Sequence, residues 1–183
     1  MNDRSGAMPS ADGALARAVS LDRASAADEP LLSNLLELYI HDLSRAFPEV
    51  ELGPDGRFGY PKLALYLSEP ESHFAFLIRS QGRLSGFVLA TRGSPVVEDP
   101  NVLDIAEFFV IRGQRRKGVG RAAAQLLWRE LPGRWVVRVS EENPAALAFW
   151  RGIIAEFTNG TMTESIRPSA RNAWRVFRFE STA

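Results

Sequence analysis

The chain has 183 residues, of which 45% are hydrophobic, and it carries 22 basic and 22 acidic side chains. A chain of this length buries one sizeable core, and its formal net charge of zero excludes a global field that attracts nucleic acid or an anionic membrane. The lack of cysteine excludes disulfides and thiolate metal sites, and His41 and His73 have no partner at zinc-binding spacing, so we expect no metal.

The N-terminal 13 residues are small and polar and contain no apolar stretch. We therefore expect residues 1–13 to be a disordered tail rather than a signal peptide, and residues 14–183 to form a single domain. No segment approaches the roughly 18 apolar residues that a membrane span requires. These features predict a cytoplasmic protein that does not associate with membranes.

The N-terminal half of this domain is predicted to hold one long helix among strands. Leucines and Tyr39 recur at helical spacing over residues 28–45. Proline, glycine and aspartate make residues 46–60 a loop. The other predicted elements are a strand over 14–21, a short helix over 61–67, a hairpin of strands over 73–79 and 84–91, and a fourth strand over 102–111.

The C-terminal half alternates helices with strands. An amphipathic helix begins at Val119, and a second helix begins with Asn143 as N-cap and Pro144 at its first position. The predicted strands cover residues 134–140, 160–166 and 173–179. A run of strands followed by strand–helix–strand–helix predicts a mixed α/β sheet.

A basic, glycine-rich turn joins the strand over 102–111 to the helix at Val119. The first amides of a helix lack internal acceptors and lie at the positive end of its dipole, and glycines let an anion approach the backbone. The turn therefore predicts a phosphate or pyrophosphate site. It is not a nucleoside triphosphate loop, because no Ser or Thr follows Lys117 in the required place. Its residues are Arg115, Arg116, Lys117, Gly118, Val119, Gly120 and Arg121.

This turn resembles motif A of the GNAT superfamily of N-acetyltransferases, Arg/Gln-x-x-Gly-x-Gly/Ala, and a later segment resembles motif B, Asn-x-x-Ala-x-x-Phe-Tyr. The matching residues are Arg115, Gly118 and Gly120 in the first motif and Asn143, Ala146 and Phe149 in the second. Trp150 replaces the usual Tyr, and Ile154-Ala155 replaces the usual Gly-Phe. The resemblance implies a central mixed sheet of about seven strands with helices on both faces.

The resemblance also implies that acetyl-coenzyme A is the acyl donor. In that family the turn, here residues 115–121, holds the pyrophosphate, and pantetheine lies where the fourth strand splays from the fifth. Phe108, Phe109 and Val110 are then expected beside pantetheine, with the Val110 amide donating to the thioester carbonyl. Asn143 and Trp150 complete the coenzyme-binding residues that we predict. The arginines of the turn are thereby assigned to the coenzyme and not to nucleic acid.

Glu107 is the candidate general base, because it is a carboxylate within an otherwise apolar strand, three residues before Val110. Burial would raise its pKa toward neutrality. An outward-facing or ion-paired glutamate is the alternative interpretation, and Asp104, Glu141 and Glu142 are weaker candidates for the base.

The group that protonates the leaving thiolate is not evident from the sequence. The indole of Trp150 donates a hydrogen bond but transfers no proton near neutral pH. Three hypotheses remain: unassisted departure, a catalytically weak protein, or another hydroxyl, namely Tyr39, Tyr60, Tyr66 or Ser140.

The acceptor site is expected between the first helices, with Tyr39, Asp42 and Tyr60 as its residues. The loop that follows is acidic, which suits a cationic amine: a polyamine, an aminoglycoside, an amino-acid derivative or a peptide N-terminus. The predicted function is N-acetylation of a small-molecule or peptide amine by direct attack in a ternary complex. The alternative is a non-catalytic acyl-coenzyme A binding module of the same fold, and a homodimer is left open.

Overall fold

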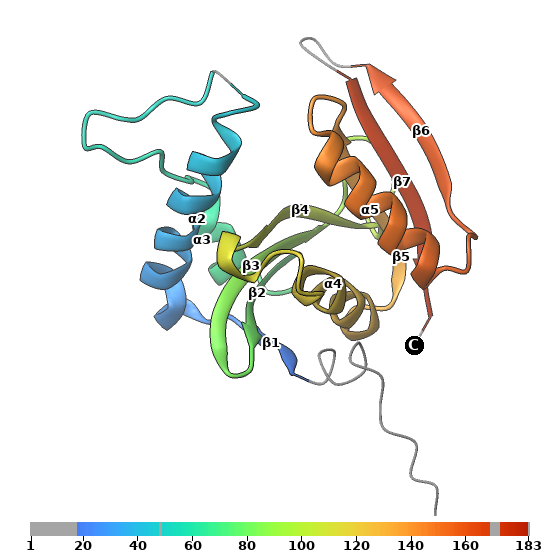
Figure 1. Ribbon diagram of the computed structural model, residues 1–183, viewed down its shortest axis with the longest axis horizontal. Helices are drawn as coiled ribbons and strands as arrows, with labels where there is room; N and C mark the ends of the chain where they lie inside the picture. The colour runs from blue at the N-terminus through green and yellow to red at the C-terminus, as the bar shows by residue number, and fades with distance from the viewer. Residues whose placement is uncertain (1–17, 48, 169–172, 183) are drawn as a thin grey trace, which may run out of the picture.

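Seven strands form one sheet in the order β1-β2-β3-β4-β5-β7-β6 (Figure 1). The computed structural model describes residues 18–47, 49–168 and 173–182, and the predicted disordered tail over residues 1–13 lies outside them. The β4–β5 pair is parallel and the other pairs are antiparallel. The prediction of a mixed α/β fold with about seven strands is therefore confirmed.

The helices and strands follow the predicted order. The strands are β1 (Val19–Arg23), β2 (His73–Ser80), β3 (Arg83–Arg92), β4 (Leu103–Val110), β5 (Gly133–Ser140), β6 (Thr163–Pro168) and β7 (Ala173–Ser181). The helices are α2 (Glu29–Leu43), α3 (Leu63–Ser68), α4 (Val119–Glu130) and α5 (Pro144–Phe157), with short 3₁₀ turns η1 (Ala26–Asp28) and η2 (Arg112–Gln114).

The largest difference from prediction lies at β6, which starts three residues later than expected. Asn159 and Gly160 have φ angles of 51° and 81° and extend the turn after α5. A left-handed backbone is incompatible with a strand. The first strand also differs, because the described part runs from Val19 to Arg23, and residues 14–17 of the prediction lie outside the described residues.

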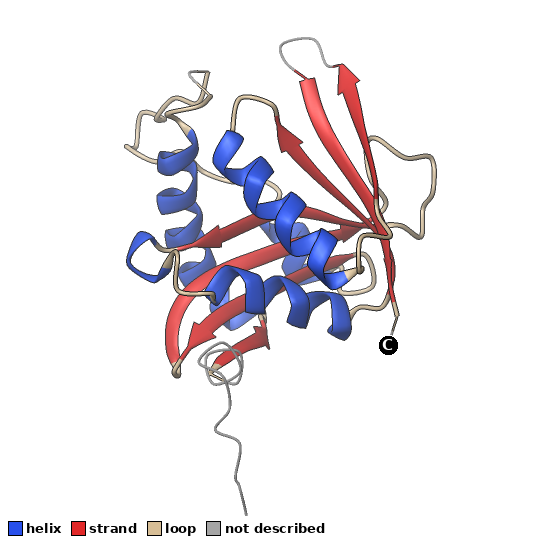
Figure 2. Ribbon diagram, turned by 45° about the vertical axis from the view of Figure 1, so that its right-hand side comes forward, coloured by secondary structure: helices blue, strands red, loops and turns tan. Residues whose placement is uncertain are grey.

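Helices cover both faces of the sheet, as expected. Helices α4 and α5 pack on one face, and Figure 2 shows both lying across it. Helices α2 and α3 pack on the other face, where Leu32, Leu36 and Phe87 are among the fully buried side chains. Within residues 18–47, 49–168 and 173–182, no helix has the length and hydropathy that a membrane crossing demands. The two helix pairs thus separate the molecule into an α4/α5 face and an α2/α3 face.

Strands β4 and β5 pair only where they begin. Three residue pairs join them, Leu103 with Trp135, Asp104 with Val136 and Ile105 with Val137. Beyond these pairs β4 runs on to Val110 and β5 runs on to Ser140, and the two strands no longer pair with each other (Figure 1). The sheet therefore has a gap at its centre, bordered by backbone groups that no neighbouring strand satisfies.

Candidate active site

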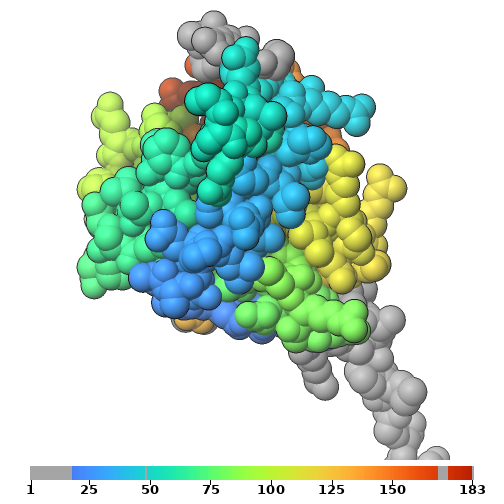
Figure 3. All heavy atoms as spheres, turned by 90° about the vertical axis from the view of Figure 1, so that its left-hand side faces the viewer, coloured from blue at the N-terminus to red at the C-terminus, as the bar shows by residue number. Residues whose placement is uncertain are grey.

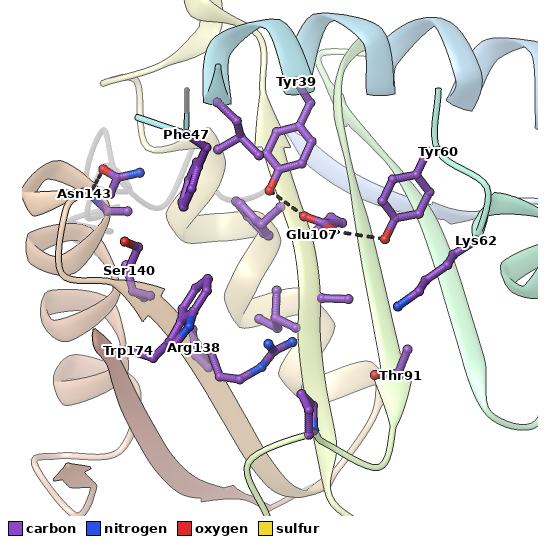
Figure 4. A pocket seen from close by; sticks show the side chains of 18 of the residues that line it. Tyr39, Phe47, Tyr60, Lys62, Thr91, Glu107, Arg138, Ser140, Asn143 and Trp174 are labelled. Atoms are coloured by element: carbon purple, nitrogen blue, oxygen red, sulfur yellow. Dashed lines mark hydrogen bonds between the residues drawn. The ribbon is translucent and has the colours of Figure 1, made fainter. Parts of the chain in front are cut away.

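A pocket of about 690 Å³ lies at this gap (Figure 4). It is lined by residues from both faces of the sheet and from the loop that follows α2. They include Tyr39, Glu49, Tyr60, Lys62, Tyr66, Glu107, Phe108, Arg138, Ser140, Asn143 and Trp150. The pocket thus brings together most of the residues that the sequence suggested for catalysis and acceptor binding, together with others that it did not.

The backbone of β4 presents donors to the gap. The amide of Ile111 donates to the Ser85 carbonyl of the neighbouring segment at 2.9 Å. Successive residues of an antiparallel pair turn their backbone groups to opposite sides, so the amides of Val110 and Phe108 point away from β3. The Val110 carbonyl accepts from Arg115 Nε at 2.7 Å. The amides of Val110 and Phe108 thereby face the open side of β4.

A bulge in β4 decides which face Glu107 occupies. Leu89 pairs with Glu107 but Ala90 pairs with Ile105, so Ala106 is the extra residue. An extra residue reverses the alternation of side chains along a strand. Glu107 therefore lies on the α2/α3 face, whereas Ile105 packs in the core beneath α4 and α5.

Two tyrosines hold the Glu107 carboxylate, each through its own oxygen. Tyr39 Oη donates to Oε2 at 2.5 Å, and Tyr60 Oη donates to Oε1 at 3.0 Å (Figure 4). Burial raises the pKa of Glu107, while the two phenols and the positive charges of Arg138 and Lys62 limit the rise. A carboxylate with a raised pKa accepts a proton more readily near neutral pH, as a general base requires.

All three tyrosines of the chain line this pocket. Burial raises the pKa of each phenol, and the nearby Glu107 charge adds to the rise. The pKa of Tyr66 rises to about 12. The phenols are therefore hydrogen-bond donors at neutral pH and hold their protons tightly.

The α4/α5 side of the pocket is aromatic. Trp150 is buried, and its ring lies 5.0 Å from that of Phe108 in an edge-to-face arrangement. Asn143 caps α5, because its side-chain oxygen accepts from the Ala146 amide at 3.0 Å. The structure thus places Trp150 as a wall of the pocket and Asn143 at its edge, where α5 begins.

The two glycines of the basic turn are needed for different reasons. Gly118, the N-cap of α4, has a φ of 75°, which other residues adopt only with strain. A Cβ added at Gly120 would lie 3.2 Å from Cζ of Phe149. The missing side chain at Gly120 therefore makes room for α5, whereas the sequence suggested that it makes room for an anion.

The start of α4 still offers backbone donors. The first helical hydrogen bond runs from the Ala122 amide to the Gly118 carbonyl at 3.0 Å. The amides of residues 119–121 precede it and have no acceptor within the helix. With the positive end of the dipole of a helix of 12 residues behind them, these amides fit a pyrophosphate.

Several basic side chains of the turn are paired within the protein. Asp42 accepts from Arg112 at 2.6 Å and from Arg115 at 2.5 Å. Figure 3 shows the yellow residues of the turn directly against the blue α2, which carries Asp42. Asp42 thus faces the turn, and it is not among the residues that line the pocket.

The remaining cations of the turn differ in how they are held. Lys117 donates to the Gly113 carbonyl at 2.6 Å, and Arg121 pairs with Glu156. Arg116 is exposed and has no ion-pair partner within the described ranges 18–47, 49–168 and 173–182. Arg116 is therefore the side chain of the turn that is most available to an anionic ligand.

An ion pair that was not evident from the sequence lies on the α2/α3 side of the pocket. Arg138 of β5 donates to both carboxylate oxygens of Asp104, at 2.9 and 3.2 Å, and Asp104 is fully buried. Burial raises the pKa of Asp104, and Arg138 opposes that rise. The signal that could have revealed this pair is an arginine in the middle of the apolar stretch Trp135–Val139.

The carboxylates of Glu141 and Glu142, the weaker candidates for the general base, lie outside the pocket. Glu141 pairs with Arg175, and neither Glu141 nor Glu142 lines the pocket. Among the residues that the structure describes, no group of three or more His, Asp or Glu side chains is arranged to hold a metal ion. Glu107 is thus the carboxylate on β4 that lines the pocket, on the α2/α3 face of the sheet.

Comparison with known proteins agrees with this geometry. The model of the Acetyltransferase (GNAT) family matches residues 35–153, whereas no curated protein sequence matches the chain significantly. An acetyltransferase from Thermus thermophilus superimposes with a TM-score of 0.65 and 18% identity, over 88% of this chain and 96% of that one.

Two other solved structures are similar at comparable levels. The ribosomal-protein-S18-alanine N-acetyltransferase from Escherichia coli gives a TM-score of 0.60 with 17% identity over 90% of this chain and 95% of that one. The spermidine N-acetyltransferase from Vibrio cholerae, in complex with CoA and spermine, gives 0.61 with 13% identity over 90% and 96%. At these identities the likeness establishes the fold.

Proposed function

Because this chain belongs to the GNAT family of acetyltransferases, we propose that it transfers an acetyl group from acetyl-coenzyme A directly to an amine of a small molecule or peptide. The observation that carries the proposal is the position of Glu107. It lies in the pocket at the gap, on the acceptor side, three residues from an amide that points into the gap. A base and an oxyanion donor are thus adjacent, as attack of an amine on a thioester requires.

The reaction assigns one task to each group. The Glu107 carboxylate takes a proton from the ammonium form of the acceptor, directly or through water, and frees the nitrogen lone pair. The nitrogen forms a bond to the acetyl carbon while the Val110 amide stabilises the charge that develops on the carbonyl oxygen. Glu107 passes this first proton to solvent. The carbon–sulfur bond then breaks and the thiolate leaves with the electron pair, while the nitrogen gives up its second proton to Glu107, which releases it to solvent.

The coenzyme is proposed to enter from the α4/α5 face. Its pyrophosphate would meet the amides of residues 119–121, with Arg116 as the available cation, and pantetheine would follow the open edge of β4 beside Phe108. The glycine at 118 and the helix start supply backbone donors, which fit a phosphate of any nucleotide. The gap in the sheet adds the extended slot that a pantetheine arm fills.

Departure of the thiolate needs no protein acid in this proposal. Ordinary thiols have pKa values of about 8–9, so a thiolate is a feasible leaving group near neutral pH. Trp150 then serves as a wall of the thioester pocket, as its packing against Phe108 suggests. The cytoplasmic location, the homodimer and the single domain over residues 14–183 stay predictions from the sequence.

The test is release of free thiol from acetyl-coenzyme A in the presence of a panel of amines. We expect release that depends on one class of amine and an equal amount of acetylated product. Tight coenzyme binding without turnover across polyamines, aminoglycosides, amino acids and peptides would contradict the proposal. That result would favour the binding module, which the replacement of the motif B tyrosine by Trp150 keeps open.

A further inference from the structure

The acceptor side of the pocket contains positive charge where the sequence suggested an acidic surface. Lys62 and Arg138 both line the pocket, while Glu51 and Asp55 of the loop after α2 do not. Figure 4 shows the two cations extending into the pocket from different segments, with Glu107 and its tyrosines nearby. Glu49 also lines the pocket but is exposed. The partly buried charges of the pocket are therefore Glu107 and Arg138, which is paired with Asp104, while Lys62 and Glu49 are both exposed.

Asp104 fixes one edge of the Arg138 guanidinium. Its Nε and Nη2 donate to the buried Asp104, and its side chain is 22% exposed. No described residue accepts a hydrogen bond from its Nη1. A guanidinium fixed on one edge by a carboxylate keeps its other donors in a rigid plane, which is the arrangement that binds a second carboxylate well.

Stability alone is a poor explanation for this ion pair. Replacing a buried ion pair by well-packed apolar residues of similar volume is often neutral or stabilising, because the attraction between the charges must offset the cost of removing both from water. Asp104 is fully buried next to β5, and a hydrophobic residue there would continue the core. The pair places one guanidinium at the wall of the pocket that also holds Glu107.

We propose that the acceptor is an α-amino acid whose carboxylate is bound by Arg138, with Lys62 assisting, while Glu107 receives its amine. Arg138 lies close enough to Glu107 for its charge to act on that carboxylate. An α-amino acid carries its amine and carboxylate on one carbon, so a single small molecule can meet both groups. This inference rests on the proposed acetyl transfer and narrows its acceptor.

The first experiment compares matched acceptors. The twenty amino acids are assayed for thiol release, and each active one is compared with its amide and its decarboxylated amine, for example phenylalanine, phenylalaninamide and phenethylamine. Because their amines differ in pKa, the comparison uses kcat/KM for the neutral amine. Loss of a charged hydrogen-bonding partner predicts a value about 10- to 100-fold lower without the carboxylate.

The second experiment tests whether Arg138 binds the carboxylate of the acceptor amino acid. Arg138→Gln is combined with Asp104→Asn, so that no unpaired charge is buried, and Lys62→Gln is made separately. Both variants should raise the KM for the amino acid relative to the KM for its amide, the first by about 10-fold or more, with each variant measured above the acidic limb of its own pH–rate profile. Arg83→Gln, at the exposed start of β3 and outside the pocket, is the matched control.

The outcomes distinguish failure of the proposed carboxylate site from failure of the proposed acetyl transfer. If spermidine or phenethylamine is acetylated as well as the amino acids, acetyl transfer stands and the carboxylate site is overturned. An unchanged preference in the double variant, with its fold verified by circular dichroism, overturns the role of Arg138 and leaves it as the partner of Asp104. Absence of turnover with every amine overturns the proposed function and this inference together.

Discussion

The two faces of the sheet form their halves of the pocket by different means. On the α4/α5 face, the groups offered to a ligand are backbone amides of β4 and of the first turn of α4, all within residues 108–121. On the α2/α3 face they are side chains from four separate segments, Tyr39, Tyr60, Glu107 and Arg138. Backbone donors suit a ligand that never changes, whereas side chains can be exchanged one by one to fit another acceptor. Under the proposed function, the α4/α5 face is the donor face, which binds the coenzyme, and the α2/α3 face is the acceptor face, which selects the amine.

The strongest test of the acceptor face is Glu107→Gln. The variant keeps the shape but accepts no proton, so turnover should fall about 100-fold or more, as expected for loss of a general base. Because the base works only when ionised, wild-type activity should decline as the pH falls through the raised pKa of Glu107, and the variant should lose this acidic limb. Initial rates from pH 5 to 9 provide the measurement.

Stability gives an independent control for the same variant. A carboxyl whose folded pKa is raised contributes stability that is complete below its unfolded pKa and is lost as the pH rises through the folded value. The melting temperature of Glu107→Gln relative to wild type should therefore improve with rising pH. Coenzyme affinity should not change. A variant that keeps the wild-type rate and profile would make Glu107 structural.

The donor face is tested by Gly120→Asp. The added carboxylate lies at the start of α4, where it repels a pyrophosphate, so affinity for acetyl-coenzyme A should fall about 10-fold or more. The new Cβ also approaches Phe149, so Gly120→Asn, with the same shape and no charge, is the necessary control. Calorimetry with both folded variants gives the difference. Equal affinities would show that no anion binds at this turn.

A smaller effect is expected from the tyrosines that hold Glu107. Tyr39→Phe and Tyr60→Phe each remove a hydrogen bond that lowers the pKa of Glu107. Each variant should therefore move the acidic limb of the pH–rate profile to higher pH, with a modest loss of rate. Tyr66→Phe, which removes no bond to Glu107, should leave the limb in place. A large loss of kcat in Tyr66→Phe would instead assign that phenol as the acid for the thiolate.

The smallest effect on turnover is predicted for Trp150, whose side chain packs against Phe108 on the donor face. Trp150→Phe should cost about 1–2 kcal/mol of stability through the smaller ring and should change turnover little. Trp150→Tyr should leave the rate unchanged or raise it modestly, because it restores a phenol next to the sulfur. A collapse of turnover in Trp150→Phe, at unchanged melting temperature and coenzyme affinity, would show that the indole N–H takes part.

The elements of the donor face were predictable because their signals are local. The helix start at Val119 and the cap at Asn143 each depend on a few neighbouring residues, whereas the left-handed conformation of Gly118 is a finding of the structure. The role of Gly120 in anion binding stays a prediction, and the approach of Phe149 to it could not be predicted because Phe149 belongs to another helix. Asp42 was expected at the acceptor and instead pairs with Arg112 and Arg115, which depends on how α2 meets the basic turn.

The sequence by itself determined the order of strands and helices, the glycine-rich helix start after β4 and the identity of Glu107 as the notable carboxylate of its strand. Only the tertiary structure decided where that carboxylate points, because one bulged residue, Ala106, reverses the alternation of β4. It also decided that Tyr39, Tyr60 and Arg138 meet there, since they are separated by tens of residues and only sheet pairing and helix packing bring them together. Local periodicity records which face a residue shares with its neighbours, whereas long-range packing determines what that face meets.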